Sequence, residues 1–229
     1  MMAALKGPGW PEIETLIELY RVRRPKARGE AFEVLVQTIL SQNTNDLNSG
    51  RAFDALRRDV GVSPESLRRA DTNLIAEAIR VGGLQNRKAP RIKDVAEGVI
   101  KRYPDGLGFL STLDDQEVRQ ALSGFKGVGP KTVDIVLDFA LGRDVVPVDT
   151  HVNRVSKRIG YVSPKASYEE VRSALEAVIP RGKRLQGHIS LIVHGRRVCR
   201  ARNPLCLSCP VSSTCRYFAE TFSKEKARR

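Results

Sequence analysis

The feature that most constrains the fold of this chain is an apolar periodicity that is helical almost throughout. Apolar residues recur at intervals of three and four over residues 32–40 and again over 133–141, which predicts a buried helix at each place. Gly142 follows the second segment as a natural C-cap. Ser167 and Glu170 form a capping box, which predicts the start of a further helix.

Strand signals are nearly absent. Only residues 144–148 have the apolar character of a short strand, and Pro147 argues against their pairing in a sheet. Ser63 and Pro64 instead start a short helix with proline at its first position. A chain of 229 residues has room for one large domain or two small ones. We therefore expect an all-α protein built from many short helices.

The charge balance indicates a polyanionic partner. The chain carries 39 Lys and Arg against 26 Asp and Glu, a formal net charge of +13, and most of the excess follows Arg181. Each Lys or Arg that docks on a phosphate releases condensed counterions, which favours binding to nucleic acid. A basic tail that only keeps the protein in solution is the plain alternative. Charge alone does not separate DNA from RNA or from an anionic lipid surface.

No segment predicts membrane insertion or secretion. No apolar run approaches the ~18 residues that span a bilayer. The first fourteen residues also lack the apolar stretch of a secretory signal. We therefore expect a cytoplasmic protein with no membrane partner.

All four cysteines, Cys199, Cys206, Cys209 and Cys215, lie in one short stretch. Two disulfides are disfavoured because a cytosolic chain keeps its thiols reduced. A structural zinc usually takes two closely spaced pairs of ligands, and only Cys206 and Cys209 form such a pair. Four thiolates are also the usual ligand set of a 4Fe–4S cluster, and the uneven spacing favours a cluster over zinc.

Residues 122–136 predict two helices joined by a glycine-rich turn. The first helix ends at Leu122 and the second begins near Pro130, which presets the first helical turn. Gly127 and Gly129 can adopt backbone angles closed to other residues, so the turn can present amide N–H groups to a phosphate. A plain turn that needs glycine only for close packing is the alternative.

Two polar residues after this turn are candidates for catalysis. Lys131 lies in the first turn of the second helix, where the helix dipole and partial desolvation lower the pKa of an amine and make it a nucleophile. A solvated lysine that binds phosphate is the alternative. Asp149 precedes a further helix, so an N-cap is its alternative role. The three histidines, at 151, 188 and 194, lack the spacing of metal ligands.

Together and in this order, GVGPKT (127–132), VDTHV (148–152) and the four-cysteine spacing resemble the endonuclease III family of helix-hairpin-helix DNA glycosylases. The likeness extends from about Phe32 to Cys215. It includes ILSQNTND (39–46), GGLQNRKA (82–89) and HISLIVHGRRVC (188–199).

The resemblance implies an all-α fold of two domains. A six-helix barrel domain would comprise residues 31–141, with the helix-hairpin-helix at about 113–141. A discontinuous iron–sulfur domain would comprise residues 1–30 and 142–229, with the cluster loop at 199–215. In this family the four cysteines hold a 4Fe–4S cluster.

The resemblance also implies a mechanism in base excision repair. The damaged base is flipped out of double-stranded DNA, and the amine of Lys131 attacks the sugar C1′ and expels the base. Asp149 helps to deprotonate the nucleophile and balances the charge that develops on the sugar. The resulting Schiff base allows elimination of the 3′ phosphate. We therefore expect a bifunctional DNA glycosylase and AP lyase that acts on oxidised pyrimidines and abasic sites.

The DNA contacts follow from the same resemblance. Leu84 matches the leucine that wedges into the duplex. The other candidates lie on the hairpin, on the turn near residue 42 and on the cluster loop: Gly127, Val128, Gly129, Gln42, Asn43, Arg200 and Arg202. The family's gap-filling glutamine aligns with Asn43, and Gln85 replaces a common tyrosine, so the lesion preference can depart from the usual oxidised pyrimidines.

Other functions explain fewer of these features. A monofunctional glycosylase for T or U opposite G carries another residue in place of Lys131 and uses water. A DNA-binding or redox-sensing iron–sulfur protein leaves the pair of Lys131 and Asp149 unexplained, and a zinc-ribbon RNA-binding protein leaves both motifs unexplained. The fourteen residues after Cys215 leave no room for the added domain of the mismatch adenine glycosylases. We expect a monomer associated with the nucleoid.

Overall fold

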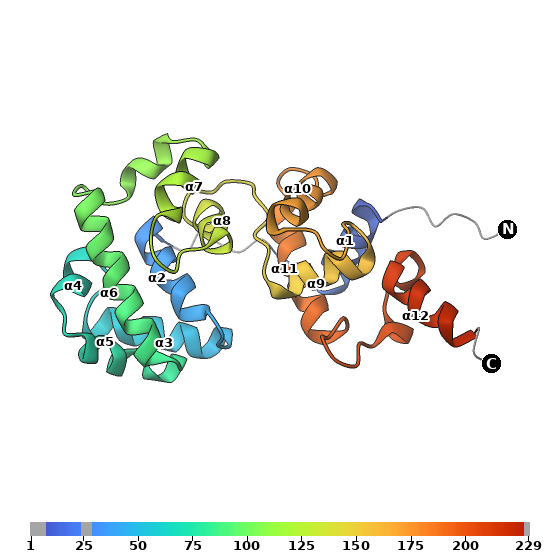
Figure 1. Cartoon of the computed structure of the whole chain (residues 1–229), viewed down its shortest axis with the longest axis horizontal. Helices are drawn as coiled ribbons and strands as arrows, with labels where there is room; N and C mark the ends of the chain where they lie inside the picture. Colours follow the sequence, from blue (N-terminus) through green and yellow to red (C-terminus); the bar gives the residue numbers. More distant parts are fainter. Residues whose placement is uncertain (1–7, 24–28, 227–229) are drawn as a thin grey trace. The chain divides into compact units, whose positions relative to one another are not determined.

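The computed structural model describes residues 8–23 and 29–226, and over these residues the chain is helical and contains no strand (Figure 1). The α-helices are α1 (Trp10–Leu19), α2 (Ala31–Ser41), α3 (Asp46–Asp59), α4 (Pro64–Arg69), α5 (Thr72–Ala78), α6 (Gln85–Arg102), α7 (Asp115–Ser123), α8 (Pro130–Phe139), α9 (Thr150–Ile159), α10 (Tyr168–Val178), α11 (Arg184–Arg197) and α12 (Arg216–Lys226). Short 3-10 helices are η1 (Arg80–Gly82), η2 (Gly108–Thr112), η3 (Cys206–Ser208) and η4 (Ser212–Thr214). The all-α prediction is confirmed. The last residues of the basic C-terminal stretch, 227–229, lie outside the described residues.

The chain folds as two compact units. One comprises Lys26–Arg143 and contains α2 to α8, and the other comprises Met1–Pro25 with Asp144–Arg229 and contains α1 and α9 to α12. Each unit has a buried apolar core of its own, as expected of units that fold around separate centres. In the described part of the chain, no helix has the length and apolar character that crossing a membrane requires.

Helix α2 forms the centre of the first unit. It is apolar nearly all round, with Leu35, Val36, Ile39 and Leu40 fully buried, and it packs against α3, α6 and α8. A helix that is apolar on all sides is stable only inside a core. The periodicity over residues 32–40 therefore predicted this helix correctly.

Helices α7 and α8 form the predicted hairpin. Asp114 caps α7 and forms a capping box with Glu117, and α8 begins at Pro130 as expected. The C-cap prediction for α8 was wrong: the helix ends at Phe139 with Ala140 as its C-cap, before Gly142. The helix ends before Gly142 because the N–H of Leu141 donates to the carbonyl of Val136, five residues earlier, and so breaks the α-helical pattern. Gly142, at φ +65°, lies in the turn that follows.

In the second unit, α10, α11 and α12 pack against α9, and α1 packs against α11. The Ser167 capping box starts α10 as predicted, and α4 starts at Pro64 behind Ser63. Residues 144–148 form no strand. Side chains satisfy their main chain instead, because Glu176 Oε1 accepts from the Val146 N–H at 3.0 Å. These elements place the N-terminus of α9 and the cysteine segment in one unit.

Candidate functional site

The turn between α7 and α8 brings the three predicted hairpin residues to the N-terminus of α8. Gly127 has φ +86°, a conformation that L side chains rarely adopt, and Gly129 is the N-cap of α8. Val128 is buried, and its N–H donates to the Phe125 carbonyl at 3.0 Å. The hairpin therefore exposes glycine main chain while one apolar side chain anchors the turn from inside.

An ion pair fixes the two helices of the hairpin. Arg119 on α7 donates to Asp134 Oδ1 on α8 at 2.6 Å, and Asp134 is buried. A buried carboxylate is tolerated because the guanidinium compensates its charge. Sequence reasoning did not identify this pair, because its partners are joined only in the folded hairpin.

Lys131 lies in the first turn of α8, directly after Pro130, and its side chain is half-buried. Positive charge near a helix N-terminus is opposed by the helix dipole. The lowered pKa expected for this amine stays a prediction. The position does combine partial burial with the amino end of a helix, and the turn holds glycine main chain beside it.

Asp149 is the N-cap of α9. Its Oδ1 accepts a hydrogen bond from the Val152 N–H at 2.7 Å, so the alternative structural role considered for this residue is real. The capping hydrogen bond to Oδ1 fixes the direction of the Asp149 carboxylate. The second carboxylate oxygen takes no part in this bond. Lys131 and Asp149 belong to different units of the chain.

The turn after α2 contains the predicted residues Gln42 and Asn43. Gln42 is the C-cap of α2, and its Oε1 accepts a hydrogen bond from Arg91 Nη1 at 2.7 Å. Asn43 has φ +53°, a conformation that asparagine tolerates better than most residues, and its side chain is exposed. The two neighbours therefore have different environments.

Leu84 is an exposed apolar residue with a strained main chain. It is 43% exposed, and it has φ +56° and ψ +28° as the N-cap of α6. The left-handed conformation costs a non-glycine residue roughly 1–2 kcal/mol. Strain of this kind is concentrated at functional sites. The assignment of Leu84 as a wedge stays a prediction.

A buried lysine that sequence reasoning missed connects these two turns. Lys88 on α6 is 3% exposed, and its Nζ donates to the Leu40 carbonyl at 2.7 Å and to the Gly82 carbonyl at 3.2 Å. Burial lowers the pKa of Lys88. The Leu40 carbonyl lies in the last turn of α2, where carbonyls lack helical partners and favour a cation. Lys88 thus joins the end of α2 to the segment before Leu84.

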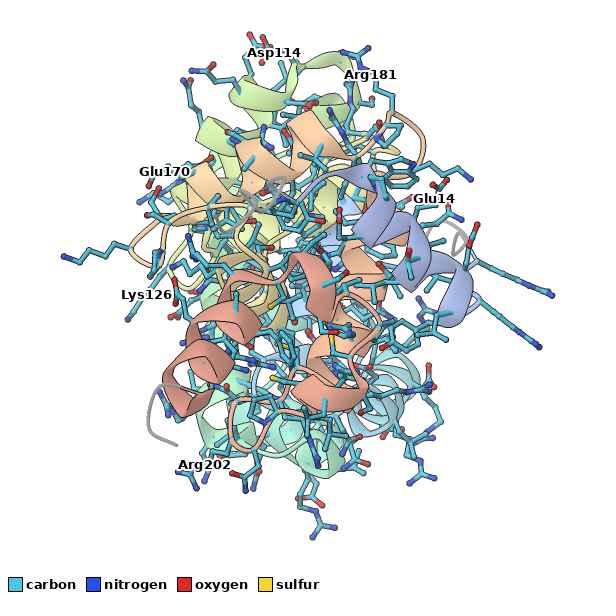
Figure 2. All side chains as sticks on the ribbon, turned by 90° about the vertical axis from the view of Figure 1, so that its right-hand side faces the viewer. Glu14, Asp114, Lys126, Glu170, Arg181 and Arg202 are labelled. Atoms are coloured by element: carbon cyan, nitrogen blue, oxygen red, sulfur yellow. The ribbon has the colours of Figure 1, made fainter. Side chains whose placement is uncertain are left out.

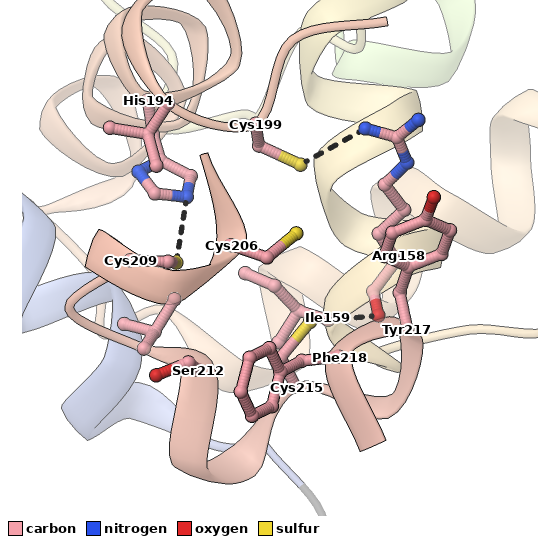
Figure 3. A pocket seen from close by; sticks show the side chains of 12 residues that line it. Arg158, Ile159, His194, Cys199, Cys206, Cys209, Ser212, Cys215, Tyr217 and Phe218 are labelled. Atoms are coloured by element: carbon pink, nitrogen blue, oxygen red, sulfur yellow. Dashed lines mark hydrogen bonds between the residues drawn. The ribbon is translucent and has the colours of Figure 1, made fainter. Parts of the chain in front are cut away.

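The four cysteines of the second unit line one cavity (Figure 3). Arg158 and His194 border the cavity together with Ile159, Tyr217 and Phe218. In the described part of the chain, no three His, Cys, Asp or Glu side chains form a ligand group for a metal ion. All four predicted thiols nevertheless line the same cavity. The protonation and the neighbours of these thiols indicate how well they suit a cluster.

The cavity disfavours negative charge on unliganded thiols. Burial, with a smaller contribution from the neighbouring cysteines, raises the pKa of Cys209 to about 11. Burial also raises the pKa of Cys206 and of Cys215, again with a contribution from the other thiols. Several thiolates in one apolar space repel one another, so they need a cationic centre between them.

Two nitrogen groups on the cavity wall lie close to the sulfur atoms. His194 Nε2 lies 3.6 Å from Cys209 Sγ, and Arg158 Nη1 donates to Cys199 Sγ at 3.6 Å (Figure 3). The hydroxyl of Tyr20 lies 2.9 Å from His194 Nδ1 on the far side of the ring. Burial lowers the pKa of His194 to about 4, so the ring is neutral at pH 7. N–H groups directed at sulfur are typical of sites that hold thiolates.

Helix α9 holds the loop that starts at Cys199. Arg158 donates to the carbonyls of Arg200 at 2.6 Å and Ala201 at 3.1 Å, and Arg154 donates to the Cys199 carbonyl at 3.0 Å. The side chains of Arg200 and Arg202 are exposed, and Figure 2 shows Arg202 at the outer edge of the loop. The helix capped by Asp149 therefore also fixes the main chain that carries these two arginines.

The comparisons with known proteins identify relatives of this chain. A sequence profile of the HhH-GPD superfamily of base excision DNA repair proteins matches residues 36–181. Endonuclease III of Sulfolobus acidocaldarius is 35% identical over 190 residues, covering 82% of this chain and 83% of the relative. Endonuclease III of Escherichia coli is 31% identical over 186 residues, covering 81% and 83%.

A solved structure shares the fold as well. A trapped covalent intermediate of endonuclease III with DNA matches with a TM-score of 0.76 and 27% identity, over 92% of this chain and 95% of that one. A thermostable thymine-DNA glycosylase matches with a TM-score of 0.72 but only 22% identity, so it supports the fold alone.

Proposed function

The chain belongs to the endonuclease III family of base excision repair DNA glycosylases, and we propose that it is a bifunctional glycosylase and AP lyase for oxidised pyrimidines. The observation that carries this proposal is Lys131 in the first turn of α8, half-buried behind the Gly127–Gly129 turn. A monofunctional relative has no need of an amine at this position.

Lys131 supplies the nucleophile in the proposed mechanism. Its neutral amine attacks the sugar C1′ of the flipped nucleotide, the glycosidic bond breaks, and its electron pair leaves with the base. Loss of the amine proton and opening of the sugar ring give a Schiff base. Removal of a C2′ proton then expels the 3′ phosphate and nicks the strand. The trapped covalent complex of the structural neighbour supports chemistry of this kind.

Asp149 supports the attack. Its carboxylate accepts the proton from the Lys131 ammonium and balances positive charge that develops on the sugar. The bond from the Val152 N–H occupies one oxygen and holds the other in a fixed direction. A preorganised carboxylate needs no reorientation during the reaction.

The chemistry of the donor set fits a 4Fe–4S cluster bound by Cys199, Cys206, Cys209 and Cys215. Four thiols line one largely apolar cavity, and the raised pKa values of Cys206, Cys209 and Cys215 support a cationic centre between them. When bound, the cluster supplies a rigid cross-link between the two ends of the loop from Cys199 to Cys206. Arg158 and His194 would direct N–H groups at its ligands.

The proposed substrate is double-stranded DNA, bound by a monomer. Glycine main chain at the hairpin binds phosphate, Arg200 and Arg202 add charge on the cluster loop, and Leu84 fills the stack after base flipping. The net charge of +13 favours such a partner. The complexes formed by the structural neighbours with DNA support this choice.

The substrate is tested by base release under single-turnover conditions. Duplexes would carry thymine glycol, a T/G mismatch or 8-oxoguanine at one position. Release of thymine glycol at a rate at least ~100-fold above that of mismatched thymine is the expected result. Faster release of mismatched thymine, without strand cleavage, would contradict the proposal and indicate a monofunctional mismatch glycosylase.

A further inference from the structure

The family resemblance places Gln42 among the candidate DNA contacts but gives it no specific role, because the gap-filling position falls on its neighbour Asn43. The structure separates these two residues. Asn43 is exposed at φ +53°, whereas Gln42 is half-buried and its side chain is held by Arg91. A side chain held in this way before DNA arrives needs an explanation of its own.

Arg91 joins two turns that are far apart in the sequence. Its Nη1 donates to Gln42 Oε1 at 2.7 Å, and its stem passes over Gly127 on the hairpin. A Cβ atom on Gly127 would lie 2.6 Å from both Cδ and Nε of Arg91, so only glycine permits this approach without a shift of the arginine. One side chain on α6 therefore contacts the turn after α2 and the hairpin turn together.

The chemistry of arginine fixes the orientation of the Gln42 amide. A guanidinium has five donors and no acceptor, so Gln42 must direct its carbonyl oxygen toward Arg91. The Nε2 group, on the other branch of the amide, then points away from Arg91. Among the described residues, the side chain of Gln42 makes no second hydrogen bond. Both N–H donors of the amide are therefore available to a ligand.

The main chain at this position is also fixed. Lys88, one turn earlier on α6, donates to the Leu40 carbonyl two residues before Gln42. The α6 helix thus holds the backbone through Lys88 and the amide through Arg91. Preorganisation of this kind lowers the entropic cost of presenting a side chain to a ligand.

We infer that Gln42 is a specificity-determining residue, oriented by Arg91 so that its amide donors contact acceptor atoms of a base at the lesion. The acceptors are carbonyl oxygens or ring nitrogens on a base edge. Arg91 is a positioning residue and not itself a contact. This inference rests on the proposed function, because it assumes that the turn after α2 meets DNA.

The contact itself is tested without activity, by the equilibrium unfolding of variants in denaturant. Arg91→Met and Gln42→Met each remove the hydrogen bond, and each is expected to raise the unfolding equilibrium constant about fivefold. The double variant should lose little more stability than either single variant, since both substitutions remove the same hydrogen bond. Gln42→Glu keeps an acceptor for Arg91 and should unfold no more readily than the wild type. Fully additive losses in the double variant would overturn the coupling.

The role is tested by affinity for a duplex that contains a stable abasic-site analogue, measured over a range of salt concentrations. Gln42→Glu and Gln42→Met both lose the amide donors, and only the first adds charge. A loss of at least ~10-fold shared by both variants is expected. Arg91→Met should also weaken binding, with the salt dependence unchanged. Wild-type affinity in both Gln42 variants would overturn the proposed contact.

A matched control separates positioning from direct phosphate contact. Lys101 lies exposed in the last turn of α6, and Lys101→Met removes one charge from the same helix. A salt slope for Arg91→Met that is about 0.9 shallower than the slope of this control would mean that Arg91 binds phosphate, which contradicts the inference. Failure of wild-type base release would refute the proposed function instead, and the unfolding and affinity series would still decide the roles of Arg91 and Gln42.

Discussion

At the residue scale, the proposed wedge Leu84 is a residue whose exposed position offers little to stability. Its exposed side chain contributes little to the core, and its left-handed main chain costs the fold energy. Strain that is retained without a packing benefit points to a role outside the folding of the unit.

Replacement of Leu84 by glycine should therefore separate stability from activity. We expect Leu84→Gly to leave the free energy of unfolding unchanged or to raise it by up to ~1 kcal/mol, because glycine adopts positive φ without strain. Base release under single-turnover conditions should fall at least ~10-fold, since the wedge is lost. Denaturant unfolding and the base-release assay measure the two effects. A loss of stability above ~1 kcal/mol would mean that Leu84 is a packing residue.

Asp149 is the N-cap of α9, and we propose that it also has the catalytic role that sequence reasoning treated as the alternative. Asp149→Asn keeps an oxygen that accepts from the Val152 N–H, so the free energy of unfolding should change by less than ~0.5 kcal/mol. Asp149→Ala should lose about 1 kcal/mol with the cap. Both variants should lose base release by ~100-fold or more, because neither carries a carboxylate. Full activity in Asp149→Asn would reduce this residue to a cap.

At the scale of elements, α6 organises the end of α2 and the turns proposed to contact DNA through two cations. Lys88 and Arg91 lie one turn apart on α6. Lys88 donates to the main-chain carbonyl of Leu40 in the last turn of α2, and Arg91 donates to the side chain of Gln42. Lys88 also contacts the segment before Leu84. A single helix thus sets the positions of residues that are otherwise distant in sequence.

Removal of the Lys88 ammonium tests this organisation. Lys88→Met leaves the Leu40 and Gly82 carbonyls without their buried donor, and it should lower the free energy of unfolding by about 1–3 kcal/mol. Lys101→Met, on the exposed end of the same helix, should stay within ~0.5 kcal/mol of the wild type. Urea unfolding of the three proteins makes the comparison. Equal stability of the two variants would show that water replaces the lysine.

Local signals predicted the helices, and their limits explain what was missed. The starts of α4, α8 and α10 follow from Pro64, Pro130 and the Ser167 capping box, all of which act within one turn. The roles of Lys88 and Arg91 could not be found in this way, because their contacts to Leu40 and Gln42 join residues 48 and 49 positions apart in the chain. From sequence alone, a lysine or arginine on a helix is expected to be exposed, because these residues are rarely buried.

At the scale of the whole molecule, the two units differ in what stabilises them. The unit of α2 to α8 has a large apolar core, whereas the core of the other unit includes Val211 and Cys215 beside the thiol cavity. Loss of the proposed cluster should therefore weaken only one unit. The sequence predicted the cysteine set because its four members are close in sequence. The hydrogen bonds of Arg154 and Arg158 to the main chain of the loop could be found only in the structure.

Cys206→Ser should remove the visible absorbance of the purified protein together with its affinity for DNA. Amide hydrogen exchange should accelerate in α9 and α11 and stay unchanged in α2 and α8, because the two cores are separate. Leu207→Ser, at an 81% exposed position in the same loop, is the matched control and should retain both absorbance and affinity. A colourless Cys206→Ser protein that still binds DNA with wild-type affinity would contradict the positioning role of the cluster.

The central claim is that Lys131 forms a covalent bond to the sugar, and borohydride trapping tests it most directly. The protein would be incubated with borohydride and a duplex that contains thymine glycol or an abasic site. The wild type and Lys126→Gln, which alters an exposed lysine of the same turn, should form a covalent complex, and Lys131→Gln should form none. A trapped complex with Lys131→Gln, or base release by the wild type without any trapping, would contradict the account.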